Sequence, residues 1–186
     1  VFTMFSWSCF ADDIEFIKKA AELGDAKAQS TIASMYESGN GLPKNQIEAA
    51  QWYTKSAEQG YAEAQNNLGF MYAGGRGIPT DYAMAMKWYG KAAEQGLPEA
   101  QYNLSVMYTN DLAVPKDYVK AYMWANLAAS KGNANAEKMR ATLEKNMKKE
   151  EILEGQRLSN EWIQKSMEKK SEEKPVTDTR MEVKPQ

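Results

Sequence analysis

Hydrophobic residues fall into two helical stripes that alternate along the chain. The first stripe has the spacing i, i+4, i+7, i+8, which places its residues on one face of an α-helix. Its first copy consists of Ala28, Ile32, Met35 and Tyr36. The second stripe follows after a short polar segment and consists of Ala49, Trp52, Tyr53 and Ser56. The two stripes predict a pair of amphipathic helices that bury their apolar faces.

Glycine, proline and capping residues separate the two predicted helices. The segment 37–45 has the sequence ESGNGLPKN, in which glycine and proline end the first helix and Asn45 can cap the second. Gly60 follows the second helix and permits a left-handed turn. Asp25 is placed to cap the first helix. The pattern therefore predicts a helix–turn–helix unit with a turn on either side.

This unit is repeated with a period of 36 residues, at 21–56, 57–92 and 93–128. The copies keep glycine, alanine, proline and tryptophan in register, as in Gly24/Gly60/Gly96, Ala28/Ala64/Ala100, Pro43/Pro79/Pro115 and Trp52/Trp88/Trp124. One such helix pair cannot bury its apolar face alone, but stacked pairs share a continuous core. We therefore predict an all-α fold, a right-handed α-solenoid of stacked helix–turn–helix repeats.

The ends of the array depart from the repeat. Residues 13–23 match only the second helix of a unit, and residues 129–168 are predicted to form a C-terminal cap with a last helix at about 149–169. In the cap, Arg140 and Glu144 stand where the repeats have Ile or Leu and Tyr. We place the repeat domain at 12–168. The polar tail 169–186 is expected to be disordered.

The first eleven residues, VFTMFSWSCFA, carry no charge and precede two aspartates. An apolar stretch that ends in small residues is typical of the end of a secretory signal, with cleavage after Ala11. This interpretation predicts a periplasmic or secreted protein. The alternative is a first helix that packs on the next unit, which leaves a cytoplasmic location open. The stretch is too short to span a bilayer.

Composition excludes several kinds of chemistry. The chain has no histidine and one cysteine, so it cannot form a Ser-His-Asp triad, a His/Cys zinc site or an intramolecular disulfide. A net charge of −2 gives no general attraction to nucleic acid. The turn Gly74–Gly77 lacks the features of a phosphate-binding loop, and Ser-x-x-Lys at 166–169 and 171–174 lacks its companion motifs. We predict no cofactor, no metal and no enzymatic activity.

The residues 64–96 carry the pattern A…LG..Y..G.G[ILV]P.D…A..WY.KAAEQG, which resembles the Sel-1-like repeat, a relative of the tetratricopeptide repeat. The resemblance implies an adaptor or scaffold protein, often exported in bacteria, in which the first helices line the concave side. Ser105, Asp111 and Ala113 depart from the family pattern and are expected to alter turn geometry more than fold. The cysteines of the branch linked to β-lactam binding or hydrolysis are missing.

Some first-helix residues point away from the packing stripe and are candidates for binding a protein or peptide. They are Asn66, Asn67, Phe70, Tyr102, Asn103 and Val106. Their counterparts in the first unit are Lys27, Ser30, Thr31 and Ser34. Aromatic residues are enriched at interfaces, and asparagine can hydrogen-bond a peptide backbone in both senses. We predict a monomer that binds a partner here. The competing hypotheses are an amidohydrolase or β-lactamase-like enzyme and a binder of cell-wall glycan.

Overall fold

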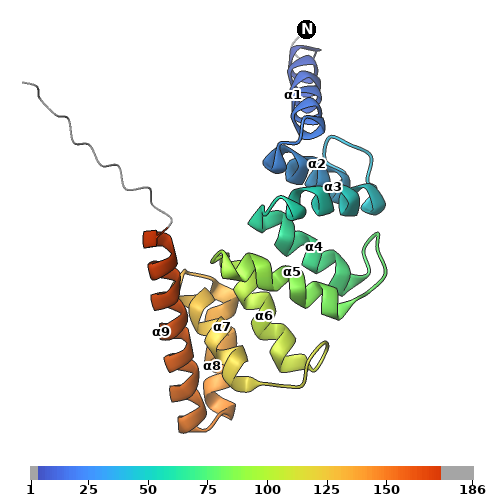
Figure 1. The fold of residues 1–186 in the computed structure, drawn as a ribbon. Helices are drawn as coiled ribbons and strands as arrows, with labels where there is room; N and C mark the ends of the chain where they lie inside the picture. Colours follow the sequence, from blue (N-terminus) through green and yellow to red (C-terminus); the bar gives the residue numbers. More distant parts are fainter. Residues whose placement is uncertain (1–3, 173–186) are drawn as a thin grey trace, which may run out of the picture.

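The computed structural model describes residues 4–172, which form nine α-helices and no strand (Figure 1). The helices are α1 (Met4–Glu22), α2 (Ala26–Ser38), α3 (Gln46–Glu58), α4 (Ala62–Gly74), α5 (Tyr82–Glu94), α6 (Pro98–Asn110), α7 (Tyr118–Ser130), α8 (Ala134–Asn146) and α9 (Lys149–Glu172). Helices α2 to α8 each contain 13 residues. This uniform length reflects the uniform spacing of their start and stop signals.

The helices repeat with the period of the sequence. The first helices α2, α4, α6 and α8 begin at residues 26, 62, 98 and 134, and the second helices α3, α5 and α7 begin at 46, 82 and 118. Each first helix of a complete unit packs on its second helix, and each second helix packs on the first helix of the next unit. The predicted all-α solenoid is therefore confirmed.

Side-chain caps mark the start of α2, α3, α5, α7 and α8, whereas α4 and α6 begin without one. Asp25 Oδ1 accepts a hydrogen bond from the Ala28 amide at 2.6 Å, and Asn45 Oδ1 accepts one from the Ile47 amide at 3.1 Å. The later second helices use Asp81 and Asp117 in the same way. These bonds satisfy amides at the helix start that have no partner within the helix. The predicted caps are confirmed.

The turn of the third unit keeps part of the glycine-rich geometry. Asp111 has φ 56° and ψ 35°, close to the φ 63° and ψ 35° of its counterpart Gly75. Among the described residues it is the one non-glycine residue with positive φ. Ala113 does not adopt the positive φ of its counterpart Gly77 (72°), so the turn changes there while the fold does not. The expected change in turn geometry thus occurs at Ala113, but the expectation is wrong at Asp111.

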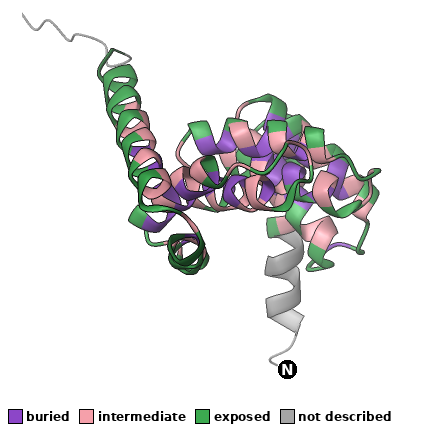
Figure 2. Cartoon of the chain, turned by 90° about the horizontal axis from the view of Figure 1, so that it is seen from below, coloured by how far each residue is buried: buried purple, intermediate pink, exposed green. Residues whose placement is uncertain are grey.

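Small side chains in register form the interior of the solenoid. Ala64, Ala85, Ala100 and Ala121 are completely buried, and Leu68 and Met71 are at most 1% exposed. In Figure 2 the buried residues lie between the helices, and the exposed ones form the outer surface. Trp88 is 6% exposed and belongs to the same apolar cluster as Leu68, while its counterparts Trp52 and Trp124 are half-buried and pack against the apolar clusters.

Complementary sizes at two positions keep the packing dense in different units. A Cβ atom on Gly69 would lie 2.8 Å from the Tyr89 ring, so a side chain there would force the ring to shift, whereas the first unit combines Ala33 with Tyr53 at the equivalent positions. The third unit carries Ser105 and Ala125 at the equivalent positions, and both are fully buried. A larger residue on one helix is thus matched by a smaller one on the other.

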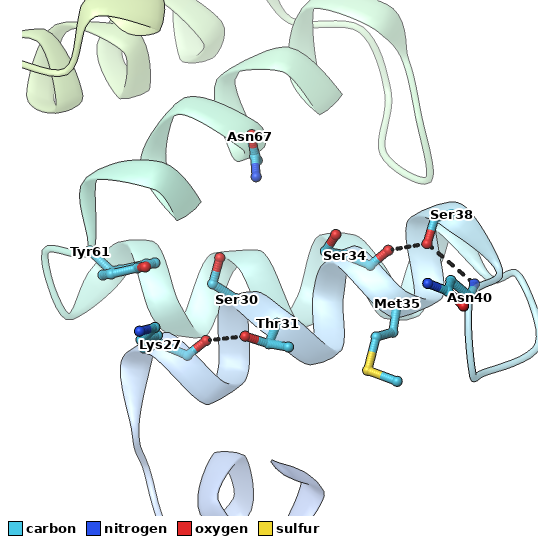
Figure 3. A pocket seen from close by; sticks show the side chains of 9 residues that line it. All are labelled: Lys27, Ser30, Thr31, Ser34, Met35, Ser38, Asn40, Tyr61 and Asn67. Atoms are coloured by element: carbon cyan, nitrogen blue, oxygen red, sulfur yellow. Dashed lines mark hydrogen bonds between the residues drawn. The ribbon is translucent and has the colours of Figure 1, made fainter. Parts of the chain in front are cut away.

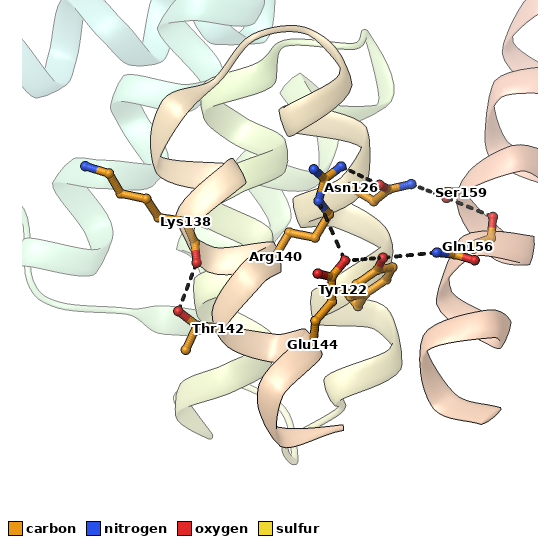
Figure 4. A network of polar contacts seen from close by, with 8 residues as sticks. All are labelled: Tyr122, Asn126, Lys138, Arg140, Thr142, Glu144, Gln156 and Ser159. Atoms are coloured by element: carbon orange, nitrogen blue, oxygen red, sulfur yellow. Dashed lines mark hydrogen bonds and ion pairs between the residues drawn. The ribbon is translucent and has the colours of Figure 1, made fainter. Parts of the chain in front are cut away.

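Helix α9 packs along α7 and closes the C-terminal end (Figure 1). Gly155 allows this approach, because a Cβ atom there would lie 2.7 Å from the Tyr122 ring. The Tyr122 hydroxyl donates to Glu144 Oε1 at 2.9 Å, and Asn126 Nδ2 donates to Ser159 Oγ at 2.9 Å (Figure 4). The helix continues to Glu172, beyond the predicted boundary at 168. Residues 173–186 of the predicted tail lie outside the described residues.

Helix α1 packs on α2 at the other end. Ile14, Ile17 and Ala21 of α1 belong to one apolar cluster with Ile32 of α2. The helix includes Ala11, the predicted cleavage point, while residues 1–3 lie outside the described range. Cleavage of a signal after Ala11 stays a prediction.

Candidate functional site

The six predicted binding residues lie on α4 and α6. Phe70 is 42% exposed, and the other five are half-buried. Together with four residues of α2 they form a surface that we call the first-helix face. It consists of Lys27, Ser30, Thr31, Ser34, Asn66, Asn67, Phe70, Tyr102, Asn103 and Val106.

A chain of amide hydrogen bonds connects two helices of the first-helix face. Asn103 Nδ2 donates to Asn66 Oδ1 at 2.9 Å, which links α6 to α4. Asn66 Nδ2 in turn donates to Asn67 Oδ1 at 3.3 Å. Some of the hydrogen-bonding groups of these asparagines are therefore engaged within the protein, and one bond links neighbouring repeats. The sequence had suggested that all three were available for a partner.

Phe70 is exposed at its edge and covered on one side by Arg76. The guanidinium carbon of Arg76 lies 4.2 Å from the centre of the Phe70 ring, a cation–π contact. Arg76 also faces Glu37 of the preceding unit at 3.8 Å, and Glu37 accepts a hydrogen bond from the Tyr53 hydroxyl at 3.0 Å. Sequence reasoning had treated Arg76 only as part of a glycine-rich turn. Its charge and its length were the signals that it could reach a neighbouring helix.

Tyr102 has a structural contact as well as an exposed part. Its ring packs against Ala128, Ala129 and Ala136, which form an apolar cluster at the junction of α7 and α8. The half-buried Tyr102 thus anchors the third unit to the cap while part of its ring still faces outward. Contacts within the protein therefore hold both Phe70 and Tyr102 in place on the first-helix face.

A cleft of about 310 Å³ opens on the first-helix face of the first unit, between α2 and the start of α4 (Figure 3). Nine residues line it: Lys27, Ser30, Thr31, Ser34, Met35, Ser38, Asn40, Tyr61 and Asn67. In Figure 3 these side chains follow α2 from Lys27 at one end to Ser38 and Asn40 at the other, and Asn67 points its amide nitrogen toward α2.

Some polar groups of the cleft are already engaged by the protein. Thr31 Oγ1 donates to the Lys27 carbonyl at 2.9 Å, and Ser38 Oγ donates to the Ser34 carbonyl at 2.8 Å. The Ser30 hydroxyl and the Lys27 ammonium have no hydrogen-bond or ion-pair partner among residues 13–172, whose side chains the structure describes. The cleft therefore offers unused hydrogen-bond donors at the Lys27 end.

The hydroxyl of Tyr53 lies near Ser34 and Asn67, two residues of the cleft lining. Burial raises the pKa of Tyr53, and the negative charge of Glu37 raises it further, whereas nearby Ser34 and Asn67 lower it. The hydroxyl is therefore protonated at neutral pH and donates to Glu37. The buried Tyr53 therefore has a structural role.

Two small residues, Ser30 and Ser34, line the cleft. They occupy the positions that carry Asn66 and Phe70 in the second unit and Tyr102 and Val106 in the third. Side chains of this larger size would narrow the cleft. Sequence reasoning emphasised the aromatic residues and missed the hollow, although the change to serine at equivalent positions was visible.

The described residues offer no sign of a metal centre or a membrane span. Among the side chains of residues 13–172, no group of three or more His, Cys, Asp or Glu is placed to hold a metal ion. None of the described helices is both long and apolar enough to cross a bilayer.

Comparisons with known proteins agree with this architecture. The sequence model described as Sel1 repeat matches residues 14–25, 26–61, 62–97 and 98–133. The crystal structure of a Sel1 repeat protein from Oxalobacter formigenes superposes with a TM-score of 0.64 at 40% sequence identity, over 70% of this chain and 98% of that chain. No curated protein matches the chain in sequence.

A second similar structure is a longer protein. It is a protective antigen present in uropathogenic Escherichia coli strains, and it displays an SLR fold. The TM-score is 0.55 and the sequence identity 29%, over 92% of this chain and 45% of that chain. The present chain thus spans less than half the length of this protein.

Proposed function

This chain belongs to the Sel1 repeat family, and we propose that it is a scaffold that binds a protein or peptide on its first-helix face. Sel1 repeat proteins generally mediate protein–protein interaction, and the family is of a non-enzymatic scaffold type. We assign binding to the first-helix face because of the side chains that α2, α4 and α6 present there.

The observation that carries this proposal is the contrast between the interior and the first-helix face. Many interior positions keep one residue type from unit to unit, such as Ala28/Ala64/Ala100, Met35/Met71/Met107 and Ala49/Ala85/Ala121, although the pair Gly69/Tyr89 is exchanged for Ser105/Ala125. At equivalent positions of the first-helix face the residues are Ser30, Asn66 and Tyr102, and then Ser34, Phe70 and Val106. A surface that changes chemically from unit to unit can distinguish the residues of an extended partner.

The contacts of this surface suit a partner that is partly apolar. Phe70 and Tyr102 offer large, rigid apolar areas that lose little conformational entropy on binding, and Arg76 and the alanine cluster already hold them in place. The neighbouring amide of Asn67 and the hydroxyl of Ser30 supply hydrogen bonds that set orientation. The array thus combines apolar anchors with polar groups, as interfaces do.

Affinity capture with matched variants tests this proposal. Immobilised wild-type chain, Phe70→Ala/Tyr102→Ala and Ile47→Ala/Tyr118→Ala are incubated with an extract of the source organism, and the retained proteins are quantified by mass spectrometry. Ile47 and Tyr118 are exposed residues on second helices and control for a general loss of apolar surface. We expect the first double variant to lose specifically retained proteins and the second to keep them. Equal retention by all three proteins would refute the proposal.

Circular dichroism of the three proteins accompanies the capture experiment. Tyr102 packs on three alanines, so its truncation is expected to lower stability as well as binding. Capture is therefore measured at a temperature at which every variant keeps the wild-type helical signal. A loss of capture under this condition reports the surface rather than unfolding.

We also propose that the chain is exported, on the basis of the uncharged segment 1–11 and the small residues before Asp12. N-terminal sequencing of the protein purified from its source tests this proposal. A mature N-terminus at Asp12 supports cleavage after Ala11. An N-terminus within or before residues 1–11 contradicts it.

A further inference from the structure

We propose that the cleft of the first unit receives an acidic residue of an extended peptide, whose neighbouring apolar residue contacts Phe70. This inference rests on the proposed function and adds the chemistry and direction of the ligand. It concerns the nine residues that line the cleft between α2 and α4.

The charge of the cleft favours a carboxylate. Lys27 is the one charged residue among the nine that line it, and its ammonium forms no ion pair with the side chains described, those of residues 13–172. Asp25, the nearest acidic residue along the chain, already accepts the Ala28 amide at the start of α2. The lining itself holds no acidic residue, while burial and the charges of Glu63 and Asp25 raise the pKa of the lining residue Tyr61.

The hydrogen-bonding groups of the cleft point to the same ligand chemistry. The hydroxyl of Ser30 is not engaged by any residue whose side chain is described, although Ser30 is only 8% exposed. The amide nitrogen of Asn67 points toward α2 from α4 (Figure 3). An ammonium, a hydroxyl and an amide nitrogen can all donate to carboxylate or peptide carbonyl oxygens.

The size of the cleft excludes a folded element. A volume of about 310 Å³ lies at the lower end of the range of small-ligand sites. It can accommodate one or two side chains with their backbone, but not a helix. An extended segment that enters the cleft continues onto α4, where Phe70 is the next exposed apolar residue of the first-helix face.

Comparison with the other units indicates which end of the first-helix face receives the acidic residue of the peptide. At the position of Lys27 the second and third units carry Glu63 and Glu99, which repel a carboxylate. At the positions of Ser30 and Ser34 they carry larger residues, which would narrow a cleft there. The acidic residue is therefore accepted by the first unit, and the apolar residue lies toward the second and third.

Two variants that copy residues of the other units provide the test. Lys27→Glu installs the acidic residue of the second unit, and Ser30→Asn/Ser34→Phe installs its two larger side chains. Both changes are compatible with the repeat because the protein already uses them in equivalent positions. Lys87→Glu, at an exposed position on α5, is the matched charge control.

The probe is an equimolar pool of random synthetic decapeptides, captured on each immobilised protein and identified by mass spectrometry. We expect peptides retained by the wild-type chain and by Lys87→Glu to be enriched in Asp and Glu about fivefold, as for a partly exposed ion pair. Lys27→Glu and Ser30→Asn/Ser34→Phe should abolish this enrichment while they retain peptides with apolar residues.

The outcomes separate this inference from the proposed function. Peptides that are retained through Phe70 and Tyr102 without acidic enrichment overturn the inference and leave the proposed function in place. Acidic enrichment that persists in Lys27→Glu also overturns it. If the wild-type chain retains no peptide above the level of Phe70→Ala/Tyr102→Ala, the inference fails together with peptide binding on this face.

Discussion

Leu68 and Phe70 are two residues apart on α4, yet they belong to different regions of the molecule. Leu68 is 1% exposed, and its equivalents Ile32 and Leu104 are similar in size and equally buried. Phe70 is 42% exposed, and its equivalents are Ser34 and Val106. Stacking of identical units constrains the interior, whereas it leaves the first-helix face free to vary. Variation between units therefore marks the surface on which function can differ.

In the C-terminal cap, two positions that are apolar in the repeats carry charged residues. Arg140 and Glu144 occupy the positions of Leu68 and Tyr72. Arg140 Nη1 donates to Asn126 Oδ1 at 3.1 Å, and Glu144 accepts from Tyr122 (Figure 4). The same positions that hold apolar residues inside the array thus hold a polar network that supports α9.

The largest expected effect comes from breaking the interior. Leu68→Ala removes a fully buried side chain from the middle of the array and should lower the free energy of unfolding by about 3 kcal/mol. Urea denaturation followed by circular dichroism measures this change. Leu153→Ala, at a 54% exposed position on α9, is the control and should change stability by less than about 0.5 kcal/mol. Similar effects of the two substitutions would contradict the assigned interior.

Replacing the buried pair Gly69 and Tyr89 of the second unit with the residues of the third unit tests whether the two interior positions depend on each other. Gly69→Ser should destabilise by about 2 kcal/mol, because a Cβ atom there meets the Tyr89 ring. Gly69→Ser/Tyr89→Ala copies Ser105 and Ala125 of the third unit. The double variant should be more stable than the sum of the single changes, by at least about 1 kcal/mol in a double-mutant cycle. Strict additivity would show that the two positions are not coupled.

A substitution in the C-terminal cap should lower stability less than one in the interior. Tyr122→Phe removes the hydroxyl that donates to Glu144 and accepts from Gln156, while it keeps the ring against Gly155. We expect a loss of about 1 kcal/mol, the ordinary net value of a hydrogen bond. Hydrogen exchange should then become faster in α9 than in α4. Unchanged exchange in α9 would show that the network does not hold this helix.

Phe70→Ala should have the smallest effect on stability. It removes a cation–π contact with Arg76 at a partly exposed site, which contributes about 0.5–1 kcal/mol. Thermal unfolding of the variant and of Leu68→Ala compares the two regions directly. A loss at Phe70 as large as that at Leu68 would assign Phe70 to the interior instead of the first-helix face.

The sequence was sufficient to predict the repeat, the helix pairs and the caps, because each depends on residues close together in the chain. Asn45 and Asp81 cap the helices that directly follow them, and the left-handed turn at Gly60 (φ 91°) follows from its position after α3. The period of 36 residues then determined which units stack on one another.

Contacts between units could not be predicted in the same way. The bond from Asn103 to Asn66 and the contact of Arg76 with Glu37 depend on the angle at which successive units stack. Tyr102 was expected to be free on the surface, but it packs on alanines of α7 and α8. The cleft at Ser30 also depends on how far α4 lies from α2. These features involve the side chains of two units at once.

Side-chain footprinting of the complex with a captured partner tests the central claim most directly. Hydroxyl radicals oxidise exposed aromatic and methionine side chains, so the free chain should be labelled at Phe70, Tyr118 and Met167, which are 42%, 46% and 62% exposed. We predict that the partner protects Phe70 and the half-exposed Tyr102 while the oxidation of Tyr118 and Met167 is unchanged. Protection of Tyr118 or Met167, with Phe70 and Tyr102 oxidised as in the free chain, would contradict binding on the first-helix face.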